Sequence, residues 1–358
     1  MSARCPKCGA RYGAEARFCP QDGTRLVITS PIAGQASPVP ASRRTTEPVS
    51  ADRPEIGEFA RMAGQLLEGR YRVERKIGEG GMSFVYLATD LQTSARVAIK
   101  ILSPQIAHEK NAMARLRREA ELAGRLQHPN VCHIAALGQT EGGMVFVVMP
   151  FVEGELLCDR TMRLGHITLE ETVRLVRDIS AGLEAAHQLG IIHRDLKPEN
   201  VMLCQDEQGG VTERAVVMDF GLAKERHVGS EVEKLTATGI VLGTPEFMSP
   251  EQLRGKPLDA RSDVYALALM TYEMLTGKLP FDGSTQQDIM VARLKSEPTP
   301  IRQKRPELGF SAAIEKVLLK AMERSPAERY QTAPEFADAL ADAAGNGGRK
   351  MLERWLRR

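Results

Sequence analysis

The chain has 358 residues, of which 42% are hydrophobic and 26% charged, and its 48 basic and 46 acidic side chains give a formal net charge of +2. This composition is that of an ordinary soluble globular protein, and the balanced charge does not favour nucleic acid or a membrane surface as a general partner. The sequence has no secretory signal and no run of about 18 apolar residues, so it predicts a cytoplasmic protein without a transmembrane segment.

The first 26 residues form a compact unit punctuated by cysteine, glycine and proline. Two turns of the Cys-x-x-ligand type, 5–8 and 19–22, are each followed by glycine, and they resemble the facing knuckles of zinc ribbons. The resemblance predicts a zinc ion held by Cys5, Cys8, Cys19 and Asp22, and the alternative is a metal-free knuckle that is easily oxidised. A unit this small cannot bury enough core to fold unaided, so metal binding would supply much of its folding free energy.

This zinc-ribbon-like module, residues 1–26, is expected to be a structural unit or a contact site for a regulatory protein. Nucleic-acid binding is less favoured because only a few scattered basic side chains support it. Residues 27–66 follow as a flexible linker, since Pro, Ser, Ala, Thr and Gly dominate residues 29–50 without a helical or strand period.

From Tyr71 onward, short runs of β-forming residues predict consecutive antiparallel strands at 71–77, 84–88 and 96–101. Residues 111–127 have apolar side chains at helical spacing, and residues 144–149 return to a buried strand. The sequence therefore predicts a β-rich lobe with one helix, which ends near Pro150.

Beyond Pro150 the pattern is mainly helical. Thr168 and Glu171 form a capping box before an apolar stripe at residues 173–183, and Gly190 suits the end of that helix. Residues 263–276 and 311–323 are predicted as further helices. The fold class is thus α+β, with a β-rich N-terminal lobe, a helical C-terminal lobe and a ligand cleft between them.

Glycines lie between the first two predicted strands in Gly78-Glu79-Gly80-Gly81-Met82-Ser83, where they let the backbone approach phosphate oxygens. Taken alone, this segment could also be a plain hairpin turn. Lys100 follows on a strand in Val97-Ala98-Ile99-Lys100, and a buried ammonium there needs an anionic partner. Glu119 on the lobe helix is the predicted partner.

The strongest signal is the run His193-Arg194-Asp195-Leu196-Lys197-Pro198-Glu199-Asn200, which Asp219-Phe220-Gly221 follows after an apolar strand. This run places a carboxylate (Asp195), an ammonium (Lys197) and an amide (Asn200) within six residues, so it predicts a loop that binds charged groups. The second carboxylate, at Asp219, suits Mg²⁺.

With these motifs in this order, residues 71–342 resemble the eukaryotic-like (Hanks-type) Ser/Thr protein kinases, and Gly-Gly-Met-Ser in the glycine loop is similar to bacterial members. The resemblance implies a bilobal protein kinase fold that transfers the γ-phosphate of ATP to protein hydroxyls with Mg²⁺ or Mn²⁺. It implies that Asp195 accepts the hydroxyl proton and that Lys197 steadies the γ-phosphate. Lys100, positioned by Glu119, would contact the α- and β-phosphates.

The same resemblance assigns the metal to Asn200 and Asp219. The residues implied to contact the nucleotide are Ile77, Gly78, Glu79, Gly80, Gly81, Met82, Ser83, Val85, Ala98, Lys100, Phe151, Val152, Asn200 and Asp219. Three positions depart from the family pattern: Ser83 replaces a loop glycine, Pro150 removes a backbone donor between the lobes, and Ala123 is small for its place near Phe220.

The resemblance also identifies residues 243–245, Gly-Thr-Pro, as the segment that receives the substrate residue. Glu251, in the closing motif Ser-Pro-Glu, is expected to pair with Arg329, and Asp263 is expected to anchor the backbone of the catalytic loop.

Two threonines, Thr236 and Thr238, precede the Gly-Thr-Pro segment. The sequence suggests that autophosphorylation at these residues orders the activation segment through Arg194, because such an arginine commonly pairs with a phosphate in this family.

Residues 343–358 form a basic tail in which Met351, Leu352, Trp355 and Leu356 lie near one helical face. The tail could bind an anionic membrane or an acidic partner, or it could pack on the preceding lobe or stay solvated.

Two other functions are possible: a pseudokinase scaffold, which the intact catalytic set disfavours, and a kinase for small molecules. The segment 243–251 disfavours the second, because it suits a polypeptide.

Overall fold

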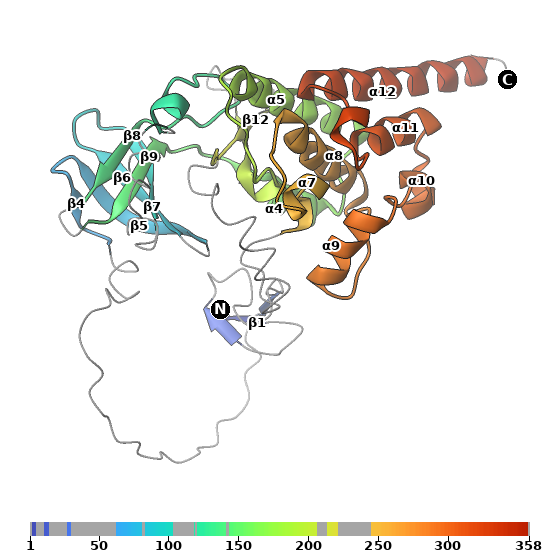
Figure 1. Cartoon of the computed structure of the whole chain (residues 1–358). Helices are drawn as coiled ribbons and strands as arrows, with labels where there is room; N and C mark the ends of the chain where they lie inside the picture. The colour runs from blue at the N-terminus through green and yellow to red at the C-terminus, as the bar shows by residue number, and fades with distance from the viewer. Residues whose placement is uncertain are drawn as a thin grey trace, which may run out of the picture. The chain divides into compact units, whose positions relative to one another are not determined.

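The computed structural model describes residues 62–80, 83–102, 118, 120–140, 143–205, 213–220 and 245–356, together with three short strands near the N-terminus (Figure 1). In those three strands, and beyond residue 345, only the backbone is described. The chain divides into two compact units, residues 1–53 and 54–358.

The first unit contains a small antiparallel sheet. Strand β1 (Ser2–Arg4) lies between β2 (Arg11–Gly13) and β3 (Val27–Thr29) and pairs with both. The side chains predicted to bind zinc, Cys5, Cys8, Cys19 and Asp22, lie outside the described residues.

A six-stranded antiparallel sheet forms the N-terminal lobe of the second unit, in the order β4-β5-β6-β7-β9-β8. Its strands are β4 (Leu66–Leu67), β5 (Tyr71–Gly80), β6 (Ser83–Asp90), β7 (Arg96–Leu102), β8 (Ala136–Gln139) and β9 (Val145–Pro150). The three strands predicted after Tyr71 are confirmed, and they pair in chain order. Helical backbone at residues 118 and 120–124 agrees with the predicted helix, whose other residues before 118 are not described.

The two faces of this sheet carry different side chains because successive residues of a strand point to opposite sides. Tyr86, Ile99 and Phe146, each at most 1% exposed, belong to the apolar cluster on one face. Ala98 belongs to the cluster on the other face, and alternation along β7 puts Lys100 on that same side. This second face is the one that turns toward the functional residues.

Helices dominate the C-terminal lobe (Figure 1). They are α4 (Leu157–Leu164), α5 (Leu169–Gln188), α7 (Pro250–Leu253), α8 (Ala260–Thr276), α9 (Gln286–Lys295), α10 (Ile301–Lys304), α11 (Ala312–Ala321) and α12 (Ala333–Leu356), with short 3₁₀ turns η1 (Pro198–Asn200), η2 (Pro245–Phe247), η3 (Pro306–Leu308) and η4 (Pro326–Glu328). A small sheet of β10 (Glu155–Leu156), β11 (Val201–Gln205) and β12 (Glu213–Val217) also belongs to this lobe.

Helix α5 begins after Thr168 and ends before Gly190, as predicted, but only one half of the predicted capping box is present. The Thr168 hydroxyl accepts the N–H of Glu171 at 3.3 Å, and Gly190 follows the helix with φ +75°. Helix α8 begins at Ala260, three residues earlier than predicted, because the Asp259 carboxylate caps the first turn through the N–H of Arg261 at 2.9 Å.

Helix α8 is the centre of the C-terminal core, since its residues from Ser262 to Tyr272 are all buried. Helix α12 packs against α5 and α11 and continues through the predicted domain boundary at residue 342 without a break (Figure 1).

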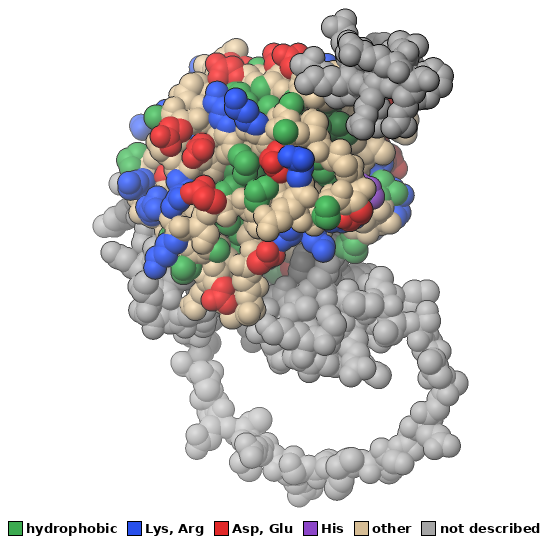
Figure 2. Space-filling model, turned by 90° about the vertical axis from the view of Figure 1, so that its right-hand side faces the viewer, with side chains coloured by type: hydrophobic (Ala, Val, Ile, Leu, Met, Phe, Trp, Pro, Cys, Tyr) green, Lys and Arg blue, Asp and Glu red, His purple; other side chains and the backbone are tan. Residues whose placement is uncertain are grey.

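The surface carries mixed charge on the face shown in Figure 2, where the described basic and acidic side chains are interspersed. This mixture fits the small net charge of the chain. Among the described residues, no helix has both the length and the apolar character needed to cross a membrane.

The predicted pair between Glu251 and Arg329 is confirmed, and it is buried. The guanidinium donates to both carboxylate oxygens, at 2.7 and 2.8 Å, and the Arg329 side chain is 0% exposed. Burial alone would raise the pKa of Glu251, but the hydrogen bonds and the charge of Arg329 lower it overall. The stabilisation is therefore present above the pKa of an unfolded glutamate and is lost as the pH falls through the lower folded pKa.

Replacing Arg329 by Met should lower the free energy of unfolding by about 3–5 kcal/mol, because Glu251 would stay buried without its cation. Urea denaturation followed by circular dichroism measures this change. The control is Arg302→Met, which removes an exposed guanidinium that lies 3.8 Å from Glu315. That control should cost less than about 1 kcal/mol. Equal losses in the two variants would contradict the prediction.

Candidate active site

The loop 193–200 between α5 and β11 is fixed to the core of the C-terminal lobe by Asp263. This carboxylate on α8 accepts the N–H groups of His193 at 2.8 Å and of Arg194 at 3.1 Å. It also lies 2.8 Å from Nε2 of His187 on α5. The predicted anchoring of the loop by Asp263 is thus confirmed.

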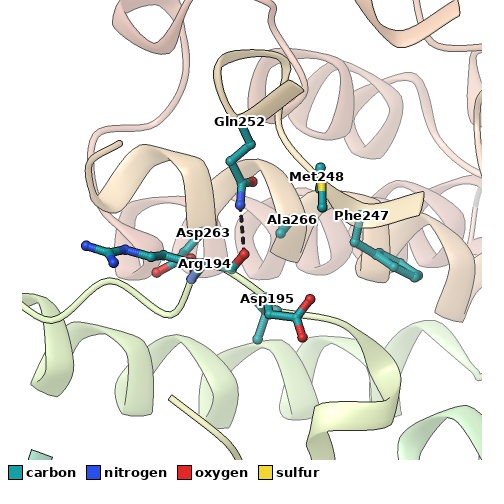
Figure 3. A pocket seen from close by; sticks show the side chains of 8 residues that line it. Arg194, Asp195, Phe247, Met248, Gln252, Asp263 and Ala266 are labelled. Atoms are coloured by element: carbon teal, nitrogen blue, oxygen red, sulfur yellow. Dashed lines mark hydrogen bonds between the residues drawn. The ribbon is translucent and has the colours of Figure 1, made fainter. Parts of the chain in front are cut away.

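Arg194 has a left-handed backbone with φ +64°, a conformation that is unfavourable for a side chain of this size. Its N–H is held by Asp263, and its carbonyl accepts the Nε2–H of Gln252 on α7 at 2.7 Å (Figure 3). These two bonds hold the N–H and the carbonyl of Arg194. They therefore fix the backbone from which the Asp195 side chain extends.

Asp195 lies among groups that bind its carboxylate and its backbone. Lys197 Nζ is 3.2 Å from Oδ2, and the Asn200 amide donates to the Asp195 carbonyl at 2.8 Å and to Oδ2 at 3.3 Å. The Asp195 N–H donates to Nδ1 of His193 at 3.3 Å. A carboxylate in this place, only 16% exposed, can accept a proton from a ligand in the cleft.

A second carboxylate, Asp219, is joined to this loop through the backbone. The Met218 N–H donates to the Asn200 carbonyl at 2.8 Å, and the Met218 carbonyl lies 2.9 Å from Nε2 of His193. Asp219 itself has φ +65°. Phe220 packs edge-on against His193, with ring centroids 4.7 Å apart.

Lys100 of the N-terminal lobe forms an ion pair with both carboxylate oxygens of Asp219. Burial would raise the pKa of Asp219, but the charge and hydrogen bonds of Lys100 lower it overall. The sequence predicted Glu119 as the partner of Lys100, and Glu119 lies outside the described residues. Lys100 and Asp219 therefore bring one charge from each lobe into the same site.

The glycine segment is built as a hairpin that continues β5 and β6. Gly78 pairs with Val85, Glu79 with Phe84 and Gly80 with Ser83, while residues 81 and 82 are not described. The Glu79 carboxylate pairs with Lys76 at 2.8 Å, and Ile77 is 36% exposed beside it.

An apolar surface lies beneath this hairpin and joins the two lobes. It is a cluster of Ala98, Leu102, Cys132, Val145, Val147, Met149, Cys204 and Val216, with Val85, Phe151, Val152 and Met218 packed against it. A flat aromatic ligand would find an apolar floor here.

Phe151 and Val152, both predicted to contact the nucleotide, differ in whether the backbone N–H group already has a partner. The Phe151 N–H donates to the Arg96 carbonyl at 3.3 Å, whereas the Val152 N–H has no hydrogen-bond partner within the described part of the chain. Arg96 also lies over the Phe151 ring at 5.1 Å. Val152 is therefore the better donor of the two.

Several predicted site residues are not described: Gly81, Met82, Glu119, Thr236 and Thr238. In the part of the chain that is described, no group of three or more His, Cys, Asp and Glu side chains is arranged to hold a metal ion.

Three residues of this region were not predicted from the sequence. Gln252 binds the Arg194 carbonyl, Asn130 donates to the Ala215 carbonyl at 2.8 Å, and Arg293 binds three carbonyls near η2. Gln252 could have been found, since it closes the capping box with Ser249 at the spacing S-x-x-Q. The partners of Asn130 and Arg293 are backbone carbonyls, which leave no signal in the sequence.

The comparisons with known proteins agree with this site. A family model described as the protein kinase domain matches residues 71–340. The Serine/threonine-protein kinase pkn3 of Myxococcus xanthus is 38% identical over 287 residues, which are 80% of this chain and 52% of that protein. Serine/threonine-protein kinase PknB of Mycobacterium tuberculosis is 38% identical over 273 residues, 75% of this chain and 42% of that protein.

Similar solved structures include the PknI kinase domain of Mycobacterium tuberculosis, with a TM-score of 0.61 and 29% identity, over 78% of this chain and 98% of that one. The chain spans about half the length, or less, of the curated relatives it matches.

Proposed function

The chain belongs to the protein kinase family, and on that premise we propose that it transfers the γ-phosphate of ATP to serine and threonine hydroxyls of proteins in intracellular signalling. One observation supports this most directly: the Asp195 carboxylate lies 3.2 Å from the Lys197 ammonium and is held by Asn200. Asp195 would accept the proton of the hydroxyl, and Lys197 would balance charge on the phosphoryl group.

Asn200 and Asp219 are the proposed ligands of Mg²⁺ or Mn²⁺. Both supply oxygen atoms, which these cations prefer, and the amide oxygen of Asn200 accepts no hydrogen bond from any described residue. When bound, the ion would neutralise phosphate charge. Lys100, with Glu119 as its positioning partner, would bind the α- and β-phosphates.

ATP would lie between the glycine hairpin and the apolar cluster. Its adenine would contact Val85 and Ala98 and accept the Val152 N–H, while residues 77–83 would cover the phosphates. The pairing of Gly80 with Ser83 carries the hairpin to the ends of both strands, where backbone N–H groups of the glycine segment could meet phosphate oxygens.

The purified chain, incubated with Mg²⁺, labelled ATP and casein, should incorporate phosphate into casein, and Asp195→Asn should lower the rate by about 10²–10⁴-fold. Removal of the metal with EDTA should abolish the reaction. Asp282→Asn is the matched control, because this carboxylate is 78% exposed on the C-terminal lobe; its rate should match that of the wild type.

The outcomes also separate the alternatives. No incorporation by the wild type, with ATP binding intact, would favour the pseudokinase scaffold. Transfer to small alcohols but never to protein would favour a small-molecule kinase. Equal incorporation by wild type and Asp195→Asn would contradict the role given to Asp195.

We further propose that the chain phosphorylates itself on Thr236 and Thr238 and that Arg194 binds the resulting phosphate. The bonds from Asp263 and Gln252 support this role, because they fix the backbone from which the Arg194 side chain extends. After incubation with ATP, mass spectrometry should find phosphate on one or both threonines, and changing both to Ala should lower casein phosphorylation several-fold. Full activity of the double variant would rule this out.

The zinc-ribbon-like module is proposed to bind one Zn²⁺ through Cys5, Cys8, Cys19 and Asp22, on the support of their spacing. Elemental analysis of the purified full chain should give about one zinc per chain, and Cys8→Ser should lose it. Cys158→Ser, which changes a half-buried thiol of the C-terminal lobe, should keep it. A wild-type chain without zinc would favour the metal-free, oxidation-sensitive knuckle.

The remaining proposals concern location and partners. A cytoplasmic location is supported by ATP as the donor and by free thiols at Cys132 and Cys204, as in a reducing compartment. Recovery of the protein from an extracytoplasmic fraction would contradict it. The N-terminal module is proposed to contact a regulatory protein, and nucleic acid is not an expected partner. Pull-down with residues 1–26 deleted, against the full chain, tests that contact.

A further inference from the structure

A fully buried guanidinium lies beneath the segment that begins at residue 245. Arg293 on α9 is 0% exposed. Its Nη1 donates to the carbonyls of Pro245 at 2.7 Å and of Met248 at 3.0 Å, and its Nη2 donates to the carbonyl of Glu246. One side chain therefore holds three of the four carbonyls in the segment 245–248.

Placing this charge in the interior is costly. Burial lowers the pKa of Arg293 below that of an exposed guanidinium, although the charge of Glu246 acts in the opposite direction. The group stays charged because the pKa of arginine lies far above neutral pH. An apolar side chain would fill the same space without the free-energy cost of burying a charge. What the guanidinium adds is its hydrogen bonds to the three carbonyls.

The segment held by Arg293 lies against the catalytic loop. Phe247 and Met248 line the same small pocket as Asp195, and Gln252 closes it through its bond to the Arg194 carbonyl (Figure 3). The carboxylate of Glu246 is close enough to Lys197 and Glu199 for their charges to shift its pKa, which burial and the charge of Glu199 raise overall. A polypeptide whose hydroxyl reaches Asp195 would therefore lie close to Phe247 and Met248.

We propose that Arg293 is a positioning residue for the polypeptide acceptor, and this inference rests on the protein kinase activity proposed above. By fixing the carbonyls of residues 245, 246 and 248, it gives the surface beside Asp195 one shape on which an acceptor can bind. Lys100 and Asp219, assigned to the ATP side, take part in none of these bonds. Loss of Arg293 should therefore weaken the use of protein and leave the use of ATP nearly intact.

The test compares three reactions of the full chain: casein phosphorylation at varied casein, casein phosphorylation at varied ATP, and ATP hydrolysis without casein. In Arg293→Met the KM for casein should rise about tenfold, because the acceptor surface loses its fixed shape. The KM for ATP and the rate of hydrolysis should stay within about twofold. Arg293→Lys, which keeps the charge and some donors, should raise the KM for casein only about threefold.

Arg254→Met is the matched control. Arg254, directly after α7, also donates to a backbone carbonyl, that of Leu294 on α9 at 3.4 Å, but its side chain is exposed. Its kinetics should match those of the wild type.

The inference is overturned if folded Arg293→Met keeps the wild-type KM for casein, or if it loses ATP hydrolysis and casein phosphorylation in equal proportion. If circular dichroism shows that Arg293→Met does not fold, Arg293→Lys decides in the same way. Failure of the proposed function itself would be visible first in the wild type, as absence of both casein phosphorylation and autophosphorylation.

Discussion

The catalytic loop of this protein kinase domain depends on one buried carboxylate. Asp263 is 1% exposed, and its buried carboxylate oxygens are bound by the His193 and Arg194 N–H groups and lie against the His187 ring. Helix α8 carries Asp263 and is buried on every side, so the carboxylate cannot move without the whole C-terminal core. The left-handed backbone at Arg194 is thus held by a carboxylate on the most deeply buried helix of the lobe, and this fixes where the neighbouring Asp195 lies.

The second carboxylate of the site is held in a different way, between the lobes. Strand β12 pairs with β11 on one side, and on the other it binds residues 130–132: Asn130 bonds to Ala215 and Val217, and the Cys132 N–H donates to the Val217 carbonyl at 2.9 Å. Asp219 follows this strand after a single residue. Any shift of the N-terminal lobe that moves residues 130–132 therefore reaches Asp219 directly, as well as through Lys100.

Much of the fold and of the site could be predicted from the sequence, because both the charged motifs and the periodic spacing of apolar residues in strands and helices depend on the identity of the side chains. The Glu251–Arg329 pair and the anchoring by Asp263 were predicted from the resemblance of these motifs to the protein kinase family, and both are present. The start of α8 was missed because Asp259 extends the helix by local capping. The roles of Asn130 and Arg293 were missed because each binds backbone carbonyls, and every residue carries one, so no sequence pattern marks the partner. Gln252 was also missed, although its spacing from Ser249 marks a capping box.

The connection between the lobes has a consequence for small molecules. Pro150 has no N–H, and the N–H of Phe151 is used by the Arg96 carbonyl, which leaves Val152 as the single main-chain donor of residues 150–152. The Pro150 carbonyl accepts the weak Cys132 thiol, at 3.6 Å. An inhibitor scaffold matched to this strip therefore needs one acceptor atom opposite Val152 and a donor beside it for Pro150. Heterocycles that need two main-chain donors in residues 150–152 should bind more weakly.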